Sequence, residues 1–191
     1  MKIKVSSINF GAKFVSSEKV LKRKASEKTY ETNVVSFVEI DPNNSNDIKS
    51  IYNATRGWFY DSYGCCILMT LRDIAENFVD QKKYKIFALT SQKNNYEELN
   101  PDKILGLSQM ILTEGETPYL NYLQVNPDYI EQYDFLKNRE YKGIGNGMLN
   151  ALKKVYDSIS LRAASSGLDS FYKKNSFSLV NKLDKKYFWK K

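Results

Sequence analysis

The stretch REYKGIGNGMLNALKKV, residues 139–155, places three glycines directly in front of a helical pattern. Apolar residues recur from Met148 to Tyr156 with the spacing of one helix face, and polar residues fill the other face. Gly143, Gly145 and Gly147 therefore lie at the N-terminus of the predicted helix. Glycine is unfavourable in a first helical turn unless the backbone needs a special conformation or must approach another group closely. The stretch predicts a turn that meets one of these needs.

A helix N-terminus that opens with glycines is suited to binding an anion. The first backbone N–H groups of a helix have no intrahelical partner, and the peptide dipoles add partial positive charge there. Arg139 and Lys142 would add two full charges beside the turn. The stretch therefore predicts a socket for phosphate or pyrophosphate, and the alternative is a flexible loop that merely precedes a helix.

The composition fits one globular domain and excludes several kinds of catalysis. The chain has 191 residues, of which 42% are hydrophobic and 27% are charged, and this is enough to bury a sizeable core. It contains no histidine, which excludes a Ser-His-Asp triad, a Cys-His dyad and a histidine-ligated metal site. The two cysteines, Cys65 and Cys66, are adjacent and lack C-x-x-C spacing, so we expect reduced core residues and no metal.

Charge and hydropathy indicate the surroundings in which the protein works. The formal net charge is +7, and basic residues cluster at 19–24 and 185–191. We expect an anionic ligand or partner, and nucleic acid is the weaker inference because many basic stretches are only solvated surface. No apolar run approaches the ~20 residues of a membrane span, and the first residues lack the apolar stretch of a signal peptide. The expectation is a cytoplasmic protein without membrane contact, of open oligomeric state.

Periodicity along the rest of the chain predicts a mixed sheet with helices on its faces. Residues 1–32 are polar and weakly patterned, and we assign them to an N-terminal extension before a domain at 33–191. Strands are predicted at 34–40, 84–90, 104–113, 118–125 and 158–164, with a last strand from Phe177; helices are predicted from Ser45 or Asn46 to before Gly57, and over 67–79 and 167–175. The order is an antiparallel meander followed by β-α-β-α-β, which is typical of an α/β (α+β mixed) fold.

Three segments in this order resemble the motifs of one family. LQVNPDY at 123–129 ends a predicted strand, REYKGIG at 139–145 opens the glycine helix, and FYKKNSF lies at 171–177. With these segments, residues 34–183 resemble the GNAT superfamily of N-acetyltransferases. The resemblance implies a central mixed, mostly antiparallel sheet in which two splayed strands form the cleft for acyl-CoA.

The resemblance also implies where acetyl-CoA would bind. The turn is similar to the family motif Q/R-x-x-G-x-G/A, which binds pyrophosphate through backbone N–H groups. By this similarity, the residues that hold the cofactor are Tyr141, Lys142, Gly143, Ile144, Gly145 and Asn146, with Leu123 and Val125 pairing to the amides of the pantetheine arm. The sequence departs from the family in four respects: Glu140 occupies the Q/R position with Arg139 one residue earlier, residues 130–137 are additional, Ser165 replaces an asparagine, and Ser176 replaces a glycine.

For the chemistry, the resemblance implies direct attack of an amine on the thioester in a ternary complex, with much of the rate supplied by positioning. The departing thiolate benefits from a proton donor, and Tyr172 is the candidate because the matching tyrosine of many family members points at the sulfur. The alternative is that Tyr172 only packs beside Phe171 and Phe177. No general base is assigned, because Glu114 and Glu116 could act only through water and are more simply interpreted as turn residues.

Three functions remain open at this level. The first is an N-acetyltransferase that uses acetyl-CoA to modify a primary amine of a small molecule or protein. The second is a toxin-like transferase that acetylates aminoacyl-tRNA, which only the basic charge supports. The third is a non-catalytic module that binds acyl-CoA or a partner protein. The acceptor would be selected by the segments at 46–82 and 128–138, neither of which contains a recognition motif.

Overall fold

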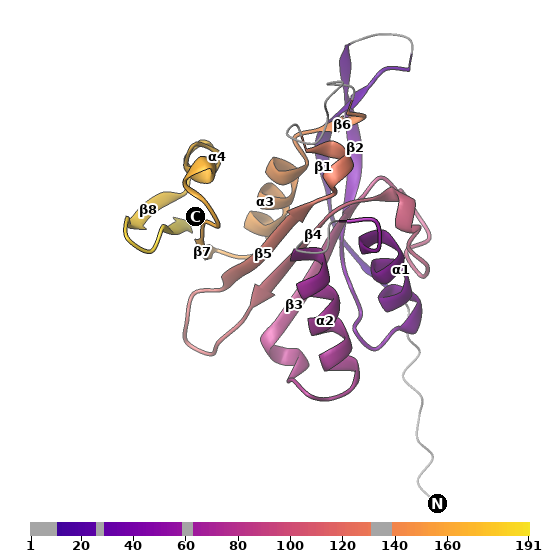
Figure 1. Cartoon of the computed structure of the whole chain (residues 1–191), viewed down its shortest axis with the longest axis horizontal. Coiled ribbons are helices and arrows are strands. Elements are labelled where there is room, and N and C mark those ends of the chain that lie inside the picture. Colours follow the sequence, from indigo (N-terminus) through magenta and orange to yellow (C-terminus); the bar gives the residue numbers. More distant parts are fainter. Residues whose placement is uncertain (1–10, 26–28, 59–62, 131–138) are drawn as a thin grey trace, which may run out of the picture.

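Nine strands form one continuous sheet in the computed structural model, which describes residues 11–25, 29–58, 63–130 and 139–191 (Figure 1). In order across the sheet they are β6 (Tyr141–Lys142), β1 (Lys13–Arg23), β2 (Tyr30–Glu39), β3 (Tyr84–Thr90), β4 (Ile104–Ile111), β5 (Tyr119–Val125), β7 (Ser158–Arg162), β9 (Lys186–Lys190) and β8 (Ser178–Asn181). Within the described residues, β5 and β7 run parallel and the other neighbours run antiparallel. The mixed, mostly antiparallel sheet predicted from the sequence is confirmed.

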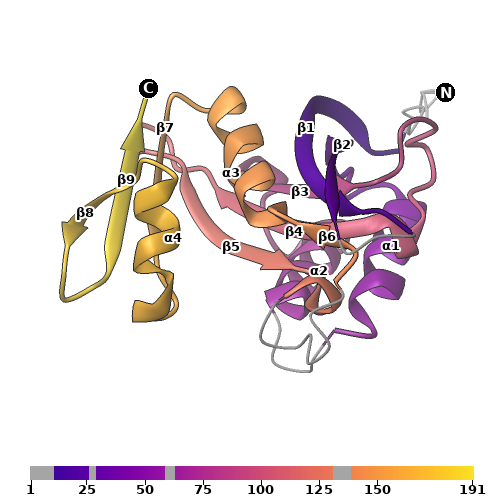
Figure 2. The same cartoon turned by 90° about the horizontal axis from the view of Figure 1, so that it is seen from above.

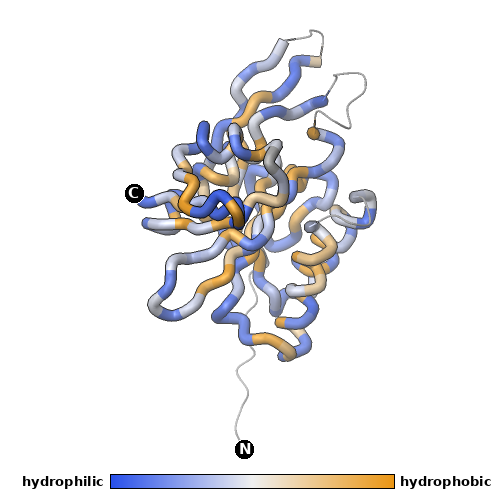
Figure 3. Tube along the Cα trace, turned by 60° about the vertical axis from the view of Figure 1, so that its left-hand side comes forward, coloured by the Kyte–Doolittle hydropathy of each residue, from blue (hydrophilic) through white to orange (hydrophobic). Residues whose placement is uncertain are grey.

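Helices cover both faces of this sheet (Figure 2). They are α1 (Ser45–Thr55), α2 (Tyr63–Ala75), α3 (Ile144–Val155) and α4 (Asp169–Lys174), with short 3-10 turns at Gln81–Lys83, Pro101–Lys103, Pro127–Tyr129 and Ser166–Leu168. Because strand side chains alternate between faces, Phe37 and Phe87 pack in the core under α3, with their rings stacked 5.0 Å apart. Their neighbours Val38 and Ala88 pack in the second core, under α1 and α2. The central strands are therefore apolar on both faces. Along the chain as a whole, hydrophobic and hydrophilic stretches are interspersed (Figure 3).

Strand β1 lies where the sequence analysis expected an N-terminal extension at 1–32. It pairs with β2 from Lys13 to Arg23, and β2 itself begins at Tyr30, before the expected domain start at 33. The described part of that segment is therefore integral to the sheet. Its sequence, KFVSSEKVLKR, hides this because only Glu18 and Val20 in it are buried. Because β6 covers β1 only at Leu21 and Lys22, most of β1 has an open edge, and charged side chains are usual on such strands.

Smaller differences concern the ends of elements. Helix α1 is capped by Asn44, whose Oδ1 accepts hydrogen bonds from the N–H groups of Asn46 and Asp47, rather than by Ser45 or Asn46. Helix α2 ends at Ala75, before the predicted 79, and Phe78 beyond it is 73% exposed. Where the sequence predicted a single last strand from Phe177, the structure has a hairpin of two strands, β8 and β9. Cys65 and Cys66, which were predicted for the core, are only half-buried. Among the described helices, none is long and apolar enough to cross a membrane.

Candidate functional site

Gly143 turns the chain from β6 into α3. It has a φ of +77°, which L side chains rarely adopt, and a Cβ built on it would meet no atom within 4 Å. Glycine is thus needed here for its conformation rather than for space. As the N-cap of α3, it offers no side chain to the first N–H groups of the helix, and no acidic residue occupies the first turn. These N–H groups are therefore left available to an anion.

Gly145, two residues after Gly143, lies where a side chain would be crowded by its neighbours. A Cβ at this position would lie 3.1 Å from the Phe171 ring of α4 and 3.8 Å from a methyl group of Val125 at the end of β5. The N-terminus of α3, the end of β5 and the start of α4 therefore meet at one point. This close approach brings two separate parts of the predicted site together, the glycine turn and the strand edge at Val125.

Strands β5 and β7 separate beside this meeting point. Their parallel pairing covers only Tyr119 with Ser160 and Leu120 with Leu161, although β5 continues to Val125 (Figure 2). On its other side β5 stays paired with β4 as far as Val125. The half of β5 that carries Leu123 and Val125 thus has no strand partner on the β7 side within the described residues. This is the splayed arrangement that the sequence analysis expected.

Tyr172 lies on α4, on the β7 side of this opening. Its side chain is only 7% exposed and packs against Phe171, Phe177 and Tyr187, with ring centroids 5.1, 6.0 and 5.3 Å away. Burial raises the pKa of Tyr172 to about 12, with smaller contributions from the hydroxyls of Tyr63 and Tyr119. The hydroxyl is therefore protonated at neutral pH.

The aromatic neighbours of Tyr172 come from elements far apart in the sequence. Tyr119 begins β5 and Tyr63 begins α2, and the hydroxyls of both add slightly to the raised pKa of Tyr172. Tyr63 also stacks on Tyr122 of β5, with centroids 5.0 Å apart. Cys66 of α2 is hydrogen-bonded to the Tyr122 hydroxyl, and burial raises the pKa of Tyr122. The α2 side of the opening is thus an aromatic, hydroxyl-bearing wall.

The other predicted cofactor-binding residues of the turn differ in whether the side chain or only the backbone is accessible to a ligand. Tyr141 and Ile144 are 4% and 2% exposed, so their side chains belong to the core and only their backbone can face a ligand. The Asn146 Oδ1 accepts a hydrogen bond of 2.9 Å from Asn175, which also donates to the carbonyl of Phe171. Asn175 therefore ties α4 to the first turn of α3, a role that the sequence analysis missed. Asn175 belongs to the FYKKNSF segment, but nothing in that motif indicated this role.

The two basic residues beside the turn are engaged with the β1–β2 hairpin. The Lys142 ammonium lies 4.0 Å from the centroid of the Tyr30 ring, and the Arg139 carbonyl accepts a hydrogen bond of 2.8 Å from the Tyr30 hydroxyl. Glu140, which occupies the Q/R position of the family motif, lies 3.3 Å from the Lys22 ammonium. The negative charge that Glu140 brings to this position therefore has the positive charge of Lys22 beside it.

The structure also places Ser176, which replaces a glycine of the family motif. Ser176 has a φ of +61°, the left-handed conformation that a glycine would adopt without strain. Glu114 and Glu116 are exposed in the turn before β5, at the end of that strand opposite the glycine helix. Residues 131–138, which make up most of the additional segment and of the expected acceptor loop, lie outside the described residues.

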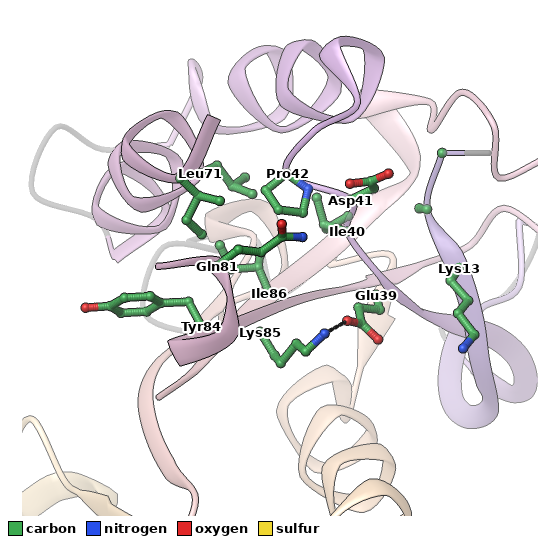
Figure 4. A pocket seen from close by; sticks show the side chains of 13 residues that line it. Lys13, Glu39, Ile40, Asp41, Pro42, Leu71, Gln81, Tyr84, Lys85 and Ile86 are labelled. Atoms are coloured by element: carbon green, nitrogen blue, oxygen red, sulfur yellow. Dashed lines mark hydrogen bonds and ion pairs between the residues drawn. The ribbon is translucent and has the colours of Figure 1, made fainter. Parts of the chain in front are cut away.

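A separate pocket of about 550 Å³ lies at the start of β3 (Figure 4). Its apolar floor includes Leu71 and Ile86, and its rim carries Asp41 and the ion pair of Glu39 with Lys85, whose atoms are 2.6 Å apart. Its lining comes from β1, β2, α2, β3 and the segments that adjoin them. None of the predicted site residues lines it, so it is distinct from the opening between β5 and β7. Around neither place do the described residues form a cluster of metal-ligating side chains.

Comparisons with known proteins bear on the fold. By sequence, the chain matches no protein-family model and none of the curated proteins. By structure, it resembles a predicted acetyltransferase from Exiguobacterium sp. 255-15, with a TM-score of 0.51 and 15% identity over 82% of this chain and 93% of that chain. A predicted GNAT-family acetyltransferase from Desulfovibrio desulfuricans gives a TM-score of 0.50 and 12% identity over 82% and 98% of the two chains. The structure of AtaTR bound with acetyl-CoA gives a TM-score of 0.51 and 14% identity over 82% of this chain and 92% of that chain.

Proposed function

Starting from the GNAT acetyltransferase fold that this chain shares with those structures, we propose that the protein is an acetyl-CoA-dependent N-acetyltransferase. It transfers the acetyl group to a primary amine of a small molecule or protein, by direct attack in a ternary complex. The observation that carries the proposal is that, among the described residues, the half of β5 beyond Leu120 has no strand partner on the β7 side and lies next to the glycine turn, which has no side-chain cap. The two features lie together because Gly145 brings α3 against Val125.

The chain offers suitable groups for each part of acetyl-CoA. Backbone N–H groups from Tyr141 to Asn146 bind the pyrophosphate, and Lys142 and Arg139 add charge. The free edge of β5 at Leu123 and Val125 pairs with the amides of the pantetheine arm, as one strand pairs with another. When bound, the thioester supplies the activated acetyl group. The aromatic wall formed by Tyr63 and Tyr122 then faces the amine acceptor.

Tyr172 acts at the sulfur when the carbon–sulfur bond breaks. The amine nitrogen forms a bond to the acetyl carbon and gives up a proton, and the departing thiolate accepts one. An ordinary thiol has a pKa near ~8.5, well below the value of about 12 for Tyr172. The hydroxyl therefore stabilises the developing thiolate mainly by donating a hydrogen bond, and a full proton transfer follows only as the amine loses its own proton. No residue is assigned as the base that receives the amine proton.

The experiment that tests the proposal measures binding and turnover separately. Calorimetry with CoA should give one site per chain, and a panel of amines with acetyl-CoA should release free thiol with at least one of them. Binding without turnover over a broad panel would favour a non-catalytic acyl-CoA module. A wild-type chain that does not bind CoA would overturn the proposal.

One observation favours a second acceptor class, aminoacyl-tRNA. Lys19, Lys22, Arg23 and Lys24 lie on β1 or directly after it, and β1 is adjacent to the glycine turn through its pairing with β6. A basic strand beside the donor site suits an acceptor with a phosphate backbone. Acetylation of aminoacyl-tRNA that falls steeply as salt is raised, together with growth arrest on expression, would establish this alternative over the small-molecule or protein amine.

A further inference from the structure

The glycine turn is held from outside by the β1–β2 hairpin. The strand before the turn, β6, pairs with β1 through Leu21 with Lys142 and Lys22 with Tyr141. The Arg23 N–H extends this ladder by donating to the Glu140 carbonyl over 2.7 Å. Residues 140–142 are therefore fixed as the outermost strand of the sheet. Without β1 they would form an ordinary loop leading into the helix.

The first residue of β2 holds the same segment by its side chain. The Tyr30 hydroxyl donates to the Arg139 carbonyl at 2.8 Å, and the Tyr30 ring lies under the Lys142 ammonium at 4.0 Å. One side chain thus contacts residues at both ends of the segment 139–142. The hydrogen bond joins positions that are 109 residues apart in the sequence.

The hairpin also contacts the helix beyond the turn. A Cβ at Gly147 would lie 3.4 Å from a methyl group of Val20, so α3 rests directly on β1. Near the other end of α3, the Lys154 ammonium lies 2.6 Å from the carboxylate of Glu18, which is only 5% exposed. Gly143 is therefore flanked on both sides by chain that β1 holds in place.

From these contacts we infer that the β1–β2 hairpin sets the geometry of the pyrophosphate socket, with Tyr30 as its positioning residue. The inference rests on the proposed function. A left-handed glycine and a set of convergent N–H groups hold an anion well only if their orientation is fixed before the ligand arrives. The hairpin supplies this order at 139–147, although none of its residues needs to touch the ligand.

The first test compares side chains of β2. Tyr30→Phe keeps the ring under Lys142 but removes the hydrogen bond to Arg139, so it should weaken CoA binding by about two- to fivefold. Tyr30→Ala removes both contacts and should weaken binding by about tenfold. Thr32→Ala is the matched control, because Thr32 is an exposed residue of the same strand, and it should bind CoA like the wild type.

The second test changes only the backbone donor of β1. Arg23→Pro removes the N–H that reaches Glu140 and keeps the strand conformation, whereas Arg23→Ala keeps that N–H. Binding weaker by about threefold or more in the proline variant than in the alanine variant is expected. Equal affinities in the two variants would contradict a role for the ladder.

Two further measurements separate positioning from general stability. Pantetheine lacks the pyrophosphate, so its binding, followed by NMR, should stay unchanged in Tyr30→Ala while CoA binding falls. Equal losses for both ligands would mean that the hairpin is merely structural. Hydrogen exchange in the free protein should quicken in Tyr30→Ala, and not in Thr32→Ala, at the Arg23 amide, which donates to the Glu140 carbonyl, and at the Gly147 amide, which donates to the Gly143 carbonyl. This readout needs no ligand, so unchanged exchange overturns the inference even if the proposed function fails for another reason.

Discussion

At the scale of single residues, Tyr172 is the side chain on which the proposed chemistry depends. Tyr172→Phe removes the hydroxyl and keeps the ring among Phe171, Phe177 and Tyr187. We expect kcat to fall by about 10² to 10³, the range for removing one hydrogen-bond donor to a developing anion, with little change in acetyl-CoA affinity. Thiol release and calorimetry measure the two quantities.

The control for this variant is Tyr52→Phe, because Tyr52 is 51% exposed on α1. It should leave both quantities at the wild-type level. A Tyr172→Phe enzyme with the wild-type kcat would make Tyr172 a packing residue only. Loss of cofactor binding together with stability would show that the hydroxyl serves the architecture rather than the sulfur.

Arg139 and Lys142 should contribute charge to phosphate binding without defining its geometry. Alanine at either position is expected to weaken CoA binding by about two- to fivefold at low salt, since partly exposed charges interact modestly. The effect should shrink as salt is raised, because ions screen such interactions. Calorimetry at two ionic strengths measures this. A loss in Lys142→Ala that does not depend on salt would mean that Lys142 acts through its contact with the Tyr30 ring instead, whereas Arg139 contacts Tyr30 through its backbone carbonyl, which alanine keeps.

At the scale of elements, the turn before α3 can be tested against a turn of the same conformation elsewhere. Gly143→Val should abolish CoA binding, because valine disfavours the φ of +77° and the N–H groups lose their orientation. Gly115, in the turn before β5, has a φ of +74° and equally open surroundings. Gly115→Val should therefore lose a similar amount of stability and still bind CoA. Calorimetry and thermal melting compare the two, and a Gly143→Val protein of unchanged affinity would exclude the turn as the site.

At the scale of the whole molecule, Asp47 makes stability depend on pH. It is fully buried in α1, and burial raises its pKa to about 6 from 3.8, more than the hydrogen bond from the Asp41 N–H lowers it. The folded state therefore holds a proton that the unfolded state releases. Its stabilising contribution is complete below about pH 4 and is lost as pH rises through 6.

Asp47→Asn removes this dependence, because the amide does not ionise. Relative to the wild type, the variant should be more stable at pH 7.5 than at pH 4.5 by on the order of 2 kcal/mol. Denaturant unfolding at the two pH values measures the difference. Asp157→Asn, whose native side chain is 91% exposed, is the control and should show no such change. A wild type whose stability rises steadily over this pH range, with Asp47→Asn parallel to it, would contradict the assignment.

The sequence by itself determined the elements whose signals are local. The glycine helix and the central strands, predicted at 84–90 and 104–113 and found at Tyr84–Thr90 and Ile104–Ile111, followed from periodicity and turn residues, which act over a few neighbouring positions. The same holds for the turn at Gly143 and the helix that carries Tyr172. The residues of the candidate site were named from the family resemblance, and their roles stay predictions; the splay of β5 from β7 was expected from the same resemblance.

Only the tertiary structure decided how these pieces are held together. Strand β1 carries a mostly polar sequence and β6 has only two residues, so neither shows a periodic apolar pattern, and both are defined by backbone pairing with a distant segment. Tyr30 contacts Arg139, and Tyr63 adds to the raised pKa of Tyr172; each pair is more than a hundred residues apart in the sequence. Such pairs leave no periodic trace, since each depends on where the whole sheet brings two unrelated segments. The chain thus encodes its glycine turn locally, but the order of that turn comes from a hairpin at the other end of the sequence.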